Sequence, residues 1–180
     1  MGKDFQIISG PDYDGGAIVT GDTSGGFLVT WSRYLSANDS DVFVRKFDAS
    51  NTPVGTQFQV NAYTSGYQRP LDTSALWDGS FLVVWGNDNV ERVRLEMQRI
   101  DTAGNPTGPI QQITPSPAVS NIYEVSIAQG ASGGLTVAWQ ENARVFVQRF
   151  VCGDATPDTD GDGIGDQCGP CPSLAASSGT

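Results

Sequence analysis

Short apolar runs that end in tryptophan recur along the chain at a fixed interval. Each run follows a glycine-containing turn, and the tryptophans stand at positions 31, 85 and 139, so both intervals are 54 residues. A fixed period of this size is typical of stacked repeats. An unbroken apolar run after a turn indicates a strand that is buried on both faces. The pattern therefore predicts three copies of one β unit.

The segments around each tryptophan run repeat as well. We expect one strand before each run and one after it, and in the first two units a turn containing Pro and Gly that leads to a fourth strand. The turns are 49–55 and 102–108, and segments 10–16 and 32–41 are interpreted as connections. The expected strands are 17–20, 27–31, 42–48 and 57–61 in the first unit, 73–76, 81–85, 95–101 and 111–113 in the second, and 124–128, 135–139 and 145–150 in the third.

The third unit stops at Cys152 without a fourth strand, whereas the chain begins with a segment that looks like one. Phe5-Gln6-Ile7 matches Phe58-Gln59-Val60, the fourth strand of the first unit. Pairing of this segment with the unit of Trp139 would complete three four-stranded sheets and leave no open edge. We therefore expect the two ends of the chain to close the structure.

The composition agrees with a β structure. The chain has 22 Gly and 10 Pro in 180 residues and no apolar run with a helical period, which indicates an all-β domain with many tight turns. The "FLVVW"-like and "VFVQRFD"-like strands and the "N-x-P-x-G" turn resemble propeller-type repeats of large secreted or surface proteins of bacteria. This resemblance covers about residues 5–151. It implies a β-propeller-like domain over residues 1–151, with three four-stranded antiparallel blades and terminal strand closure.

The charge and the distribution of apolar residues restrict the partners of the chain. Twenty acidic and ten basic residues give a net charge of −10, which repels phosphate backbones and anionic lipid surfaces. No segment approaches the length of a membrane span, and no signal-peptide core precedes the first expected strand. We expect a mature or trimmed form with no nucleic-acid partner and no membrane insertion.

A second motif lies in the C-terminal tail and predicts a Ca²⁺ site. Carboxylates occupy positions 1, 3, 5 and 9 of a loop, Gly163 stands at the sharp turn of position 6, and the Ile164 carbonyl stands at position 7. This spacing brings the hard oxygen ligands that Ca²⁺ requires around one ion. Gly169 replaces the usual carboxylate of position 12, so we expect weak affinity. The candidate ligands are Asp158, Asp160, Asp162, Ile164 and Asp166.

The cysteines also fall in the tail. Together with Cys168-Gly169-Pro170-Cys171, the acidic loop resembles a single thrombospondin type 3 calcium repeat, which we assign to residues 152–173 and follow with a flexible end at 174–180. A redox centre or a zinc site is a weaker interpretation, because the segment lacks a helix signal and the chain has no His. In an oxidising compartment, Cys152 is expected to pair with Cys168 or Cys171 and to leave one odd thiol.

Several side chains of the repeats are candidates for function. The three tryptophans are expected in the core, with a shared ligand surface as the alternative. Lys46, Arg99 and Arg149 occupy equivalent positions and are expected to pair with a neighbouring carboxylate or carbonyl that holds adjacent units; a basic ring that binds anions is the alternative. The aromatics outside the repeated strands suit a sugar-stacking surface, and Trp77, Tyr34 and Tyr67 are the candidates, with Tyr13, Tyr63 and Tyr123 of the same kind.

No pattern of catalytic residues is present. The chain has no His, no nucleophile elbow, no phosphate loop and no metalloprotease helix, and Glu91, Glu96, Glu124 and Glu141 form no recognisable pair. We therefore expect a secreted, non-enzymatic, calcium-binding module for surface adhesion or glycan binding. The alternatives are a structural subunit of an extracellular polymer and a propeller glycosidase. Because three blades do not fill a circle, we also expect a homo-oligomer, either a six-bladed dimer or a strand-exchanged assembly.

Overall fold

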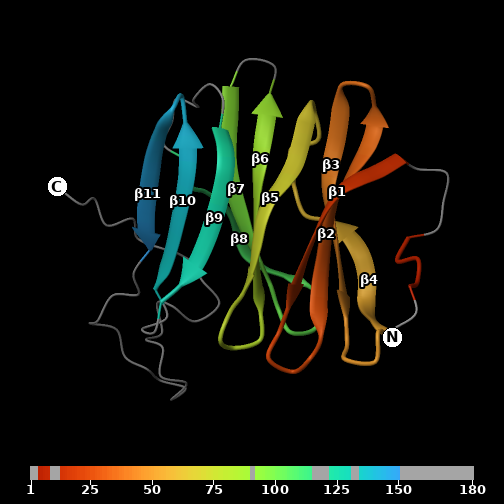
Figure 1. Cartoon of the computed structure of the whole chain (residues 1–180). Helices are drawn as coiled ribbons and strands as arrows, with labels where there is room; N and C mark the ends of the chain where they lie inside the picture. Colours follow the sequence, from red (N-terminus) through yellow and green to blue (C-terminus); the bar gives the residue numbers. More distant parts are fainter. Residues whose placement is uncertain (1–3, 9–12, 90–91, 115–121, 131–133, 151–180) are drawn as a thin grey trace.

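The computed structural model describes residues 4–8, 13–89, 92–114, 122–130 and 134–150 (Figure 1). These residues form an all-β structure with eleven strands and no helix. The strands are β1 (Tyr13–Gly21), β2 (Phe27–Ser36), β3 (Asp39–Phe47), β4 (Pro53–Gln59), β5 (Tyr67–Ala75), β6 (Phe81–Asn89), β7 (Arg92–Ile100), β8 (Pro106–Gln112), β9 (Ile122–Gln129), β10 (Leu135–Glu141) and β11 (Arg144–Phe150).

The strands pair in three antiparallel meanders that follow the three predicted units. The first unit is β1–β4, the second is β5–β8 and the third is β9–β11, and within each unit consecutive strands pair. One parallel residue pair, Ser40 with Tyr67, joins the first two units into an eight-stranded sheet. The third unit is a separate three-stranded sheet, and the sheets do not close into a barrel.

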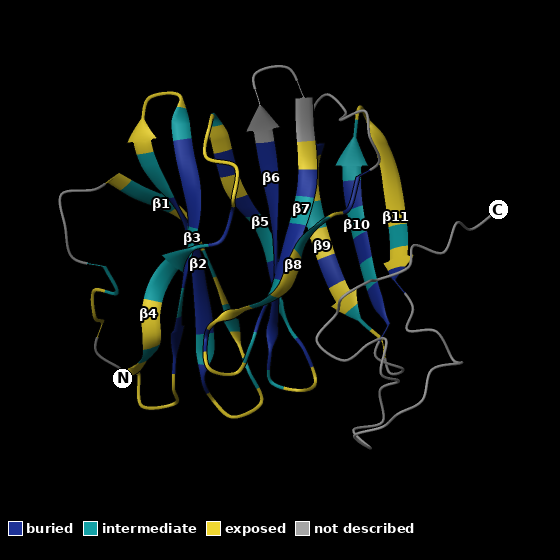
Figure 2. Ribbon diagram, turned by 180° about the vertical axis from the view of Figure 1, so that it is seen from behind, coloured by how far each residue is buried: buried dark blue, intermediate teal, exposed yellow. Residues whose placement is uncertain are grey.

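The repeated tryptophan run forms the second strand of each unit. These strands, β2, β6 and β10, begin at Phe27, Phe81 and Leu135, which keeps the 54-residue period. Each one lies between two antiparallel neighbours, so both its edges are hydrogen-bonded. Both faces of the apolar run are buried in β2 and β6, as Figure 2 shows for β6, as far as its residues are described. In β10, buried Leu135, Val137 and Trp139 alternate with half-buried Thr136 and Ala138.

Each unit has two faces, which pack against different neighbours. The tryptophan face is the side that carries the tryptophan of the unit, and the back face is the other side. Core contacts join the back face of the first unit to the tryptophan face of the second through Val42, Val44, Phe81 and Trp85. A second cluster joins the back face of the second unit to the tryptophan face of the third. The units therefore stack in one direction, each on the tryptophan face of the next.

Aspartate side chains organise the turns between strands. The Oδ1 atom of Asp48 accepts hydrogen bonds from the backbone N–H groups of Ser50 and Thr52, each at 2.8 Å. Asp101 makes the same pair of bonds in the second unit, with Ala103 and Asn105 at 2.9 and 2.8 Å. Such local bonds satisfy backbone donors that the bend would leave unpaired. The predicted turns are therefore confirmed at 49–52 and 102–105, whereas 53–55 and 106–108 already belong to β4 (Pro53–Gln59) and β8 (Pro106–Gln112).

The predicted closure of the structure by the N-terminal segment is wrong. Residues 5–7 belong to no strand, and their contacts lie in the first unit: the ring of Phe5 is 5.7 Å from that of Phe47, and Arg45 donates a hydrogen bond of 2.8 Å to the carbonyl of Ile7. Stacking in one direction places β11 at the other end of the molecule, far from the N-terminus (Figure 1). The segment instead covers the tryptophan face of the first unit, where Ile7 and Ile8 pack against Trp31 and Phe47.

Two predicted connections are partly strands. β1 already begins at Tyr13 and bulges between Gly15 and Ile18, where Gly16 adopts a positive φ of 61°. β2 extends to Ser36 and β3 begins at Asp39, so a tight turn replaces most of the expected connection 32–41. Polar residues occur there because these strand ends reach into solvent. None of the described residues forms a helix long and apolar enough to cross a membrane.

Candidate functional site

The predicted calcium site cannot be compared with the structure. Its ligands, Asp158, Asp160, Asp162, Ile164 and Asp166, and the cysteines at 152, 168 and 171 lie outside the described residues, as does the whole assigned tail. Within the described ranges, no group of three or more His, Cys, Asp or Glu side chains is arranged to hold a metal ion. Calcium binding therefore stays a prediction from the motif.

The three repeated tryptophans are core residues. Trp31, Trp85 and Trp139 are 1%, 0% and 5% exposed, which excludes a shared ligand surface at this position. The indole N–H of Trp31 donates a hydrogen bond of 3.1 Å to Asp14, whose carboxylate also binds Arg33 at 3.1 Å. Trp85 and Trp139 pack between units, as predicted, whereas Trp31 packs with Ile7, Ile8 and residues of its own unit.

The basic residues of the repeats occupy equivalent positions, because Lys46, Arg99 and Arg149 pair in register with residues 28, 82 and 136. The ammonium group of Lys46 donates a hydrogen bond of 2.6 Å to the carbonyl of Thr102, which belongs to the second unit, and lies 3.7 Å from Asp22. Lys46 thus holds adjacent units together, as predicted. Arg99 binds Asp78 and Ser80 within its own unit. Arg99 therefore does not hold adjacent units, contrary to the expectation, and both Lys46 and Arg99 are engaged by neighbouring groups.

Three tyrosine side chains gather at one end of the first two units. Tyr13 faces Tyr34 across β1 and β2, with ring centroids 5.2 Å apart, and Tyr34 faces Ser40 on β3. Ser40 is in turn the parallel partner of Tyr67 on β5, whose hydroxyl donates a hydrogen bond to the carbonyl of Ala37. Tyr13, Tyr34 and Tyr67 therefore form a row across four neighbouring strands, which we call the tyrosine row.

The tyrosine row is open to solvent although its members are large. Tyr13 is 74% exposed, Tyr67 is 37% exposed and Tyr34 is half-buried. Their neighbours Asp14 and Arg33 alternate to the other face, where they bind Trp31 and each other, so the row presents rings and hydroxyls. The register partner of Tyr67 is an acidic residue, Asp88. Tyr13 and Tyr67 also begin equivalent strands 54 residues apart, a repetition that the sequence analysis did not recognise.

The third predicted aromatic, Trp77, lies at the opposite end of the molecule from the tyrosine row. It follows β5 in the turn before β6, while Tyr67 is the first residue of β5. The side chain of Trp77 is 53% exposed, and its backbone N–H donates a hydrogen bond to Gln129 of the third unit at 3.0 Å. The structure therefore brings two of the three predicted ligand-surface residues together and separates the third.

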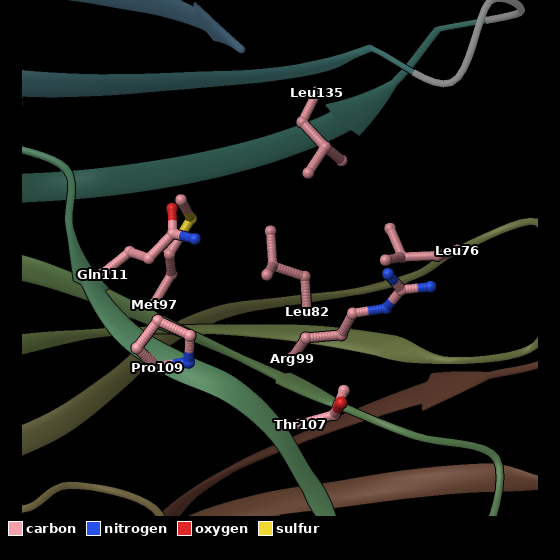
Figure 3. Close-up of a pocket in the computed structure, with 8 residues that line it drawn as sticks. All are labelled: Leu76, Leu82, Met97, Arg99, Thr107, Pro109, Gln111 and Leu135. Atoms are coloured by element: carbon pink, nitrogen blue, oxygen red, sulfur yellow. The ribbon is translucent and has the colours of Figure 1, made fainter. Parts of the chain in front are cut away.

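A small cavity lies between the second and third units (Figure 3). Its volume is about 20 Å³, and its walls are mostly apolar. Leu82 and Met97 of the second unit lie across from Leu135 of the third, and Arg99 borders the cavity while it binds Asp78. A space of this size holds at most a water molecule. We interpret it as a packing gap in the core rather than a ligand site.

Two carboxyl groups in the described part of the chain have shifted pKa values. The hydrogen bond from Ser24 lowers the pKa of Asp22, with backbone N–H groups and the Lys46 charge acting in the same direction against burial. Burial raises the pKa of Asp41, a residue that is 3% exposed, although a hydrogen bond of 2.7 Å from Asn61 opposes the shift. Both groups lie in strand ends and turns without a second titratable partner arranged for catalysis, so we interpret them as structural.

Comparison with known proteins does not identify the chain: no protein-family model, curated protein or solved structure matches it.

Proposed function

We propose that the chain is a non-enzymatic extracellular binding module whose tyrosine row binds a glycan. The observation that carries this proposal is the exposure of Tyr13 and Tyr67 on either side of Tyr34 in one line across the sheet. Soluble proteins rarely leave neighbouring aromatic rings in water unless a partner covers them. Tyrosines combine a flat apolar ring, which suits the C–H face of a sugar, with a hydroxyl that hydrogen-bonds.

The charge of the chain narrows the class of ligand. A net charge of −10 disfavours sulfated or uronic-acid polymers, and the row offers no cation of its own to offset that repulsion. We therefore propose a neutral glycan. Within the described residues, the hydrogen-bonding groups nearest the row are the three phenol hydroxyls and the turn that ends β2, which suits an exposed sugar chain better than an enclosed monosaccharide.

The proposed architecture is an arc of β-propeller blades. Two contacts between the first strands of successive units support it: Thr20 donates a hydrogen bond of 2.7 Å to the Thr73 carbonyl, and Asp72 accepts one of 2.7 Å from the backbone of Ile127. β1, β5 and β9 thus lie side by side, which is the arrangement of inner strands around a propeller axis. The thrombospondin-like motif supports the calcium-binding tail and, with it, secretion.

A glycan array with matched variants tests the binding function. The double variant Tyr13→Ser, Tyr67→Ser should lose binding to neutral glycans, because it removes two of the three rings. Trp77→Ser is the control, since it removes an equally exposed aromatic at the other end of β5. Binding that survives the double variant, or that Trp77→Ser abolishes, would contradict the proposal. Hydrolysis of chromogenic glycosides by the native chain would instead favour the glycosidase.

Calcium binding is tested separately by calorimetry. The chain should bind one Ca²⁺ with a dissociation constant of roughly 10⁻⁴ to 10⁻³ M, the range of extracellular modules. Asp162→Ala should abolish the heat, because position 5 of the loop supplies a direct ligand. Equal heats from both proteins would remove the site from the proposal without affecting the tyrosine row.

A further inference from the structure

The back face of the third unit is exposed where the same face of the other units is buried. Register alignment on the tryptophans places Val145 and Val147 of β11 at the positions of Val42 and Val44 in β3, and of Leu95 and Met97 in β7. In the first two units these four side chains are 0–1% exposed. Val145 is 76% exposed and Val147 is 63% exposed.

The repeats themselves show what covers this face. In the first unit, Val42 and Val44 pack against the tryptophan face of the second unit, and in the second unit Leu95 and Met97 pack against the tryptophan face of the third. In addition, β3 and β7 each pair with a fourth strand, whereas β11 pairs only with β10 among the described residues. Among the described residues, the third unit therefore has neither a tryptophan face to pack against nor a strand beside β11.

Residues 4–8 belong to no strand, but their apolar side chains pack as the end of a fourth strand does. Phe58 and Val60, at the end of the first unit's fourth strand, pack on the tryptophan face of the second unit, against Phe81 and Ile100. Phe5 and the isoleucines that follow it pack on the tryptophan face of the first unit in the same way, against the equivalent residues Phe27 and Phe47. The segment thus occupies the place that the last strand of a preceding unit would occupy. Phe5 remains 47% exposed.

We propose that a second copy of this chain docks head-to-tail on the back face of the third unit. Residues 4–8 of one copy pair with β11 of the other and, together with the half-buried Phe27 and Phe43, cover Val145 and Val147; Trp31 and Phe47 are already buried within one copy. This contact repeats the contact between consecutive units within one chain. We call residues 4–8 and the adjoining first unit the donor side, and the back face of the third unit the acceptor side. Two copies joined twice in this way form a closed six-unit ring with two-fold symmetry.

Light scattering of the native chain and two single variants tests the contact. The native chain should have twice the chain mass of 19.1 kDa. Val147→Lys should give a single chain mass, because a charge would be buried in an apolar contact. Trp77→Lys is the control: Trp77 is 53% exposed in the turn between β5 and β6 of the second unit, outside the proposed contact, and this variant should remain dimeric.

A mixing experiment tests the head-to-tail direction. Phe5→Lys alters the donor side, so it should be monomeric alone while its circular dichroism spectrum stays native. Mixed with Val147→Lys at the highest soluble concentration, Phe5→Lys should form a dimer. Val147→Lys then supplies the intact donor side, and Phe5→Lys supplies the intact acceptor side. A monomeric native chain, a dimeric Val147→Lys variant or a mixture that stays monomeric would each overturn the proposal. The first of these results would assign the face to another segment of this chain or to a further repeat.

Discussion

Replacement of Lys46 by methionine tests the contact between the first two units most directly. The Lys46 side chain is 8% exposed, and its ammonium group donates a hydrogen bond of 2.6 Å to the Thr102 carbonyl across the boundary. It also lies 5.4 Å from the ring centroid of Phe81, another residue of the second unit. Methionine keeps the apolar stem, so the change removes the charge and the hydrogen bond with little loss of packing.

The magnitude follows from the kind of hydrogen bond that is lost. A bond from a charged donor stabilises a protein by about 1.5–3 kcal/mol. Thr102 is an exposed residue, so water replaces part of the lost bond and we expect the low end of that range, about 1.5–2 kcal/mol. For a chain of this size, 1 kcal/mol lowers the melting temperature by about 2–4 °C, which gives a decrease of about 3–8 °C.

Thermal unfolding followed by circular dichroism measures the effect. Arg99→Met is the matched control, because Arg99 has the equivalent register position but binds Asp78 and Ser80 within its own unit. Partly exposed ion pairs contribute little, so the control should lose less than Lys46→Met. A Lys46→Met variant that melts within about 1 °C of the native chain, or above Arg99→Met, would refute the role of Lys46 between units.

Three further predictions concern packing and pH. Gly26→Ala should destabilise the chain by about 1–3 kcal/mol in urea unfolding, because the added Cβ would lie 2.8 Å from the Phe47 carbonyl oxygen. In the control Gly21→Ala the nearest atom is 3.8 Å away, so the loss of stability should be small. Equal losses in the two variants would contradict the prediction. Trp85→Ala should cost about 3–5 kcal/mol, and a loss below 1 kcal/mol would mean that this residue is not central to the core. Burial raises the pKa of Asp41 in the folded state, so the buried charge destabilises the native chain fully above the folded pKa and not at all below the unfolded pKa. Asp41→Asn has no such charge, so its stability relative to the native chain should increase as the pH rises. A difference between the urea midpoints of the two proteins that is the same at pH 3 and pH 7 would refute this assignment.

The repeat pattern predicted the centre of each unit well and its ends poorly. The second strands were located because both their faces are buried, which requires an uninterrupted apolar run such as Phe81–Trp85. Tyr13–Gly16 and the polar end of β2 were missed, since strand ends that reach into solvent have the composition of loops. Backbone hydrogen bonds continue to these strand ends, but burial of apolar side chains does not. Only burial of apolar side chains produces a recognisable hydrophobic pattern in the sequence.

The candidate sites depended on relations that a linear pattern does not contain. Tyr34 and Tyr67 come together because one parallel pair between Ser40 and Tyr67 joins two units, and no local signal predicts such a pair. The N-terminal segment was correctly likened to Phe58-Gln59-Val60, but its destination was wrong. Its similarity to the end of a fourth strand indicates that the segment covers a tryptophan face. Which of the three tryptophan faces it covers depends on how the units stack, because only the face of the first unit is close to it.

Stacking in one direction also has a consequence for folding cooperativity. The second unit contributes to two of the three core clusters, whereas the third contributes to one. In a quasi-one-dimensional array, stability is a sum of intrinsic terms and nearest-neighbour couplings, so a unit coupled on both sides opens last. Amide hydrogen exchange should therefore be slowest in β6 and β7 and fastest in β11, with a gradient along the array instead of one global rate. A partner bound to the exposed back face of the third unit would couple that unit on its second side. Hydrogen exchange in β11 should then be slower and closer to that in β6 and β7.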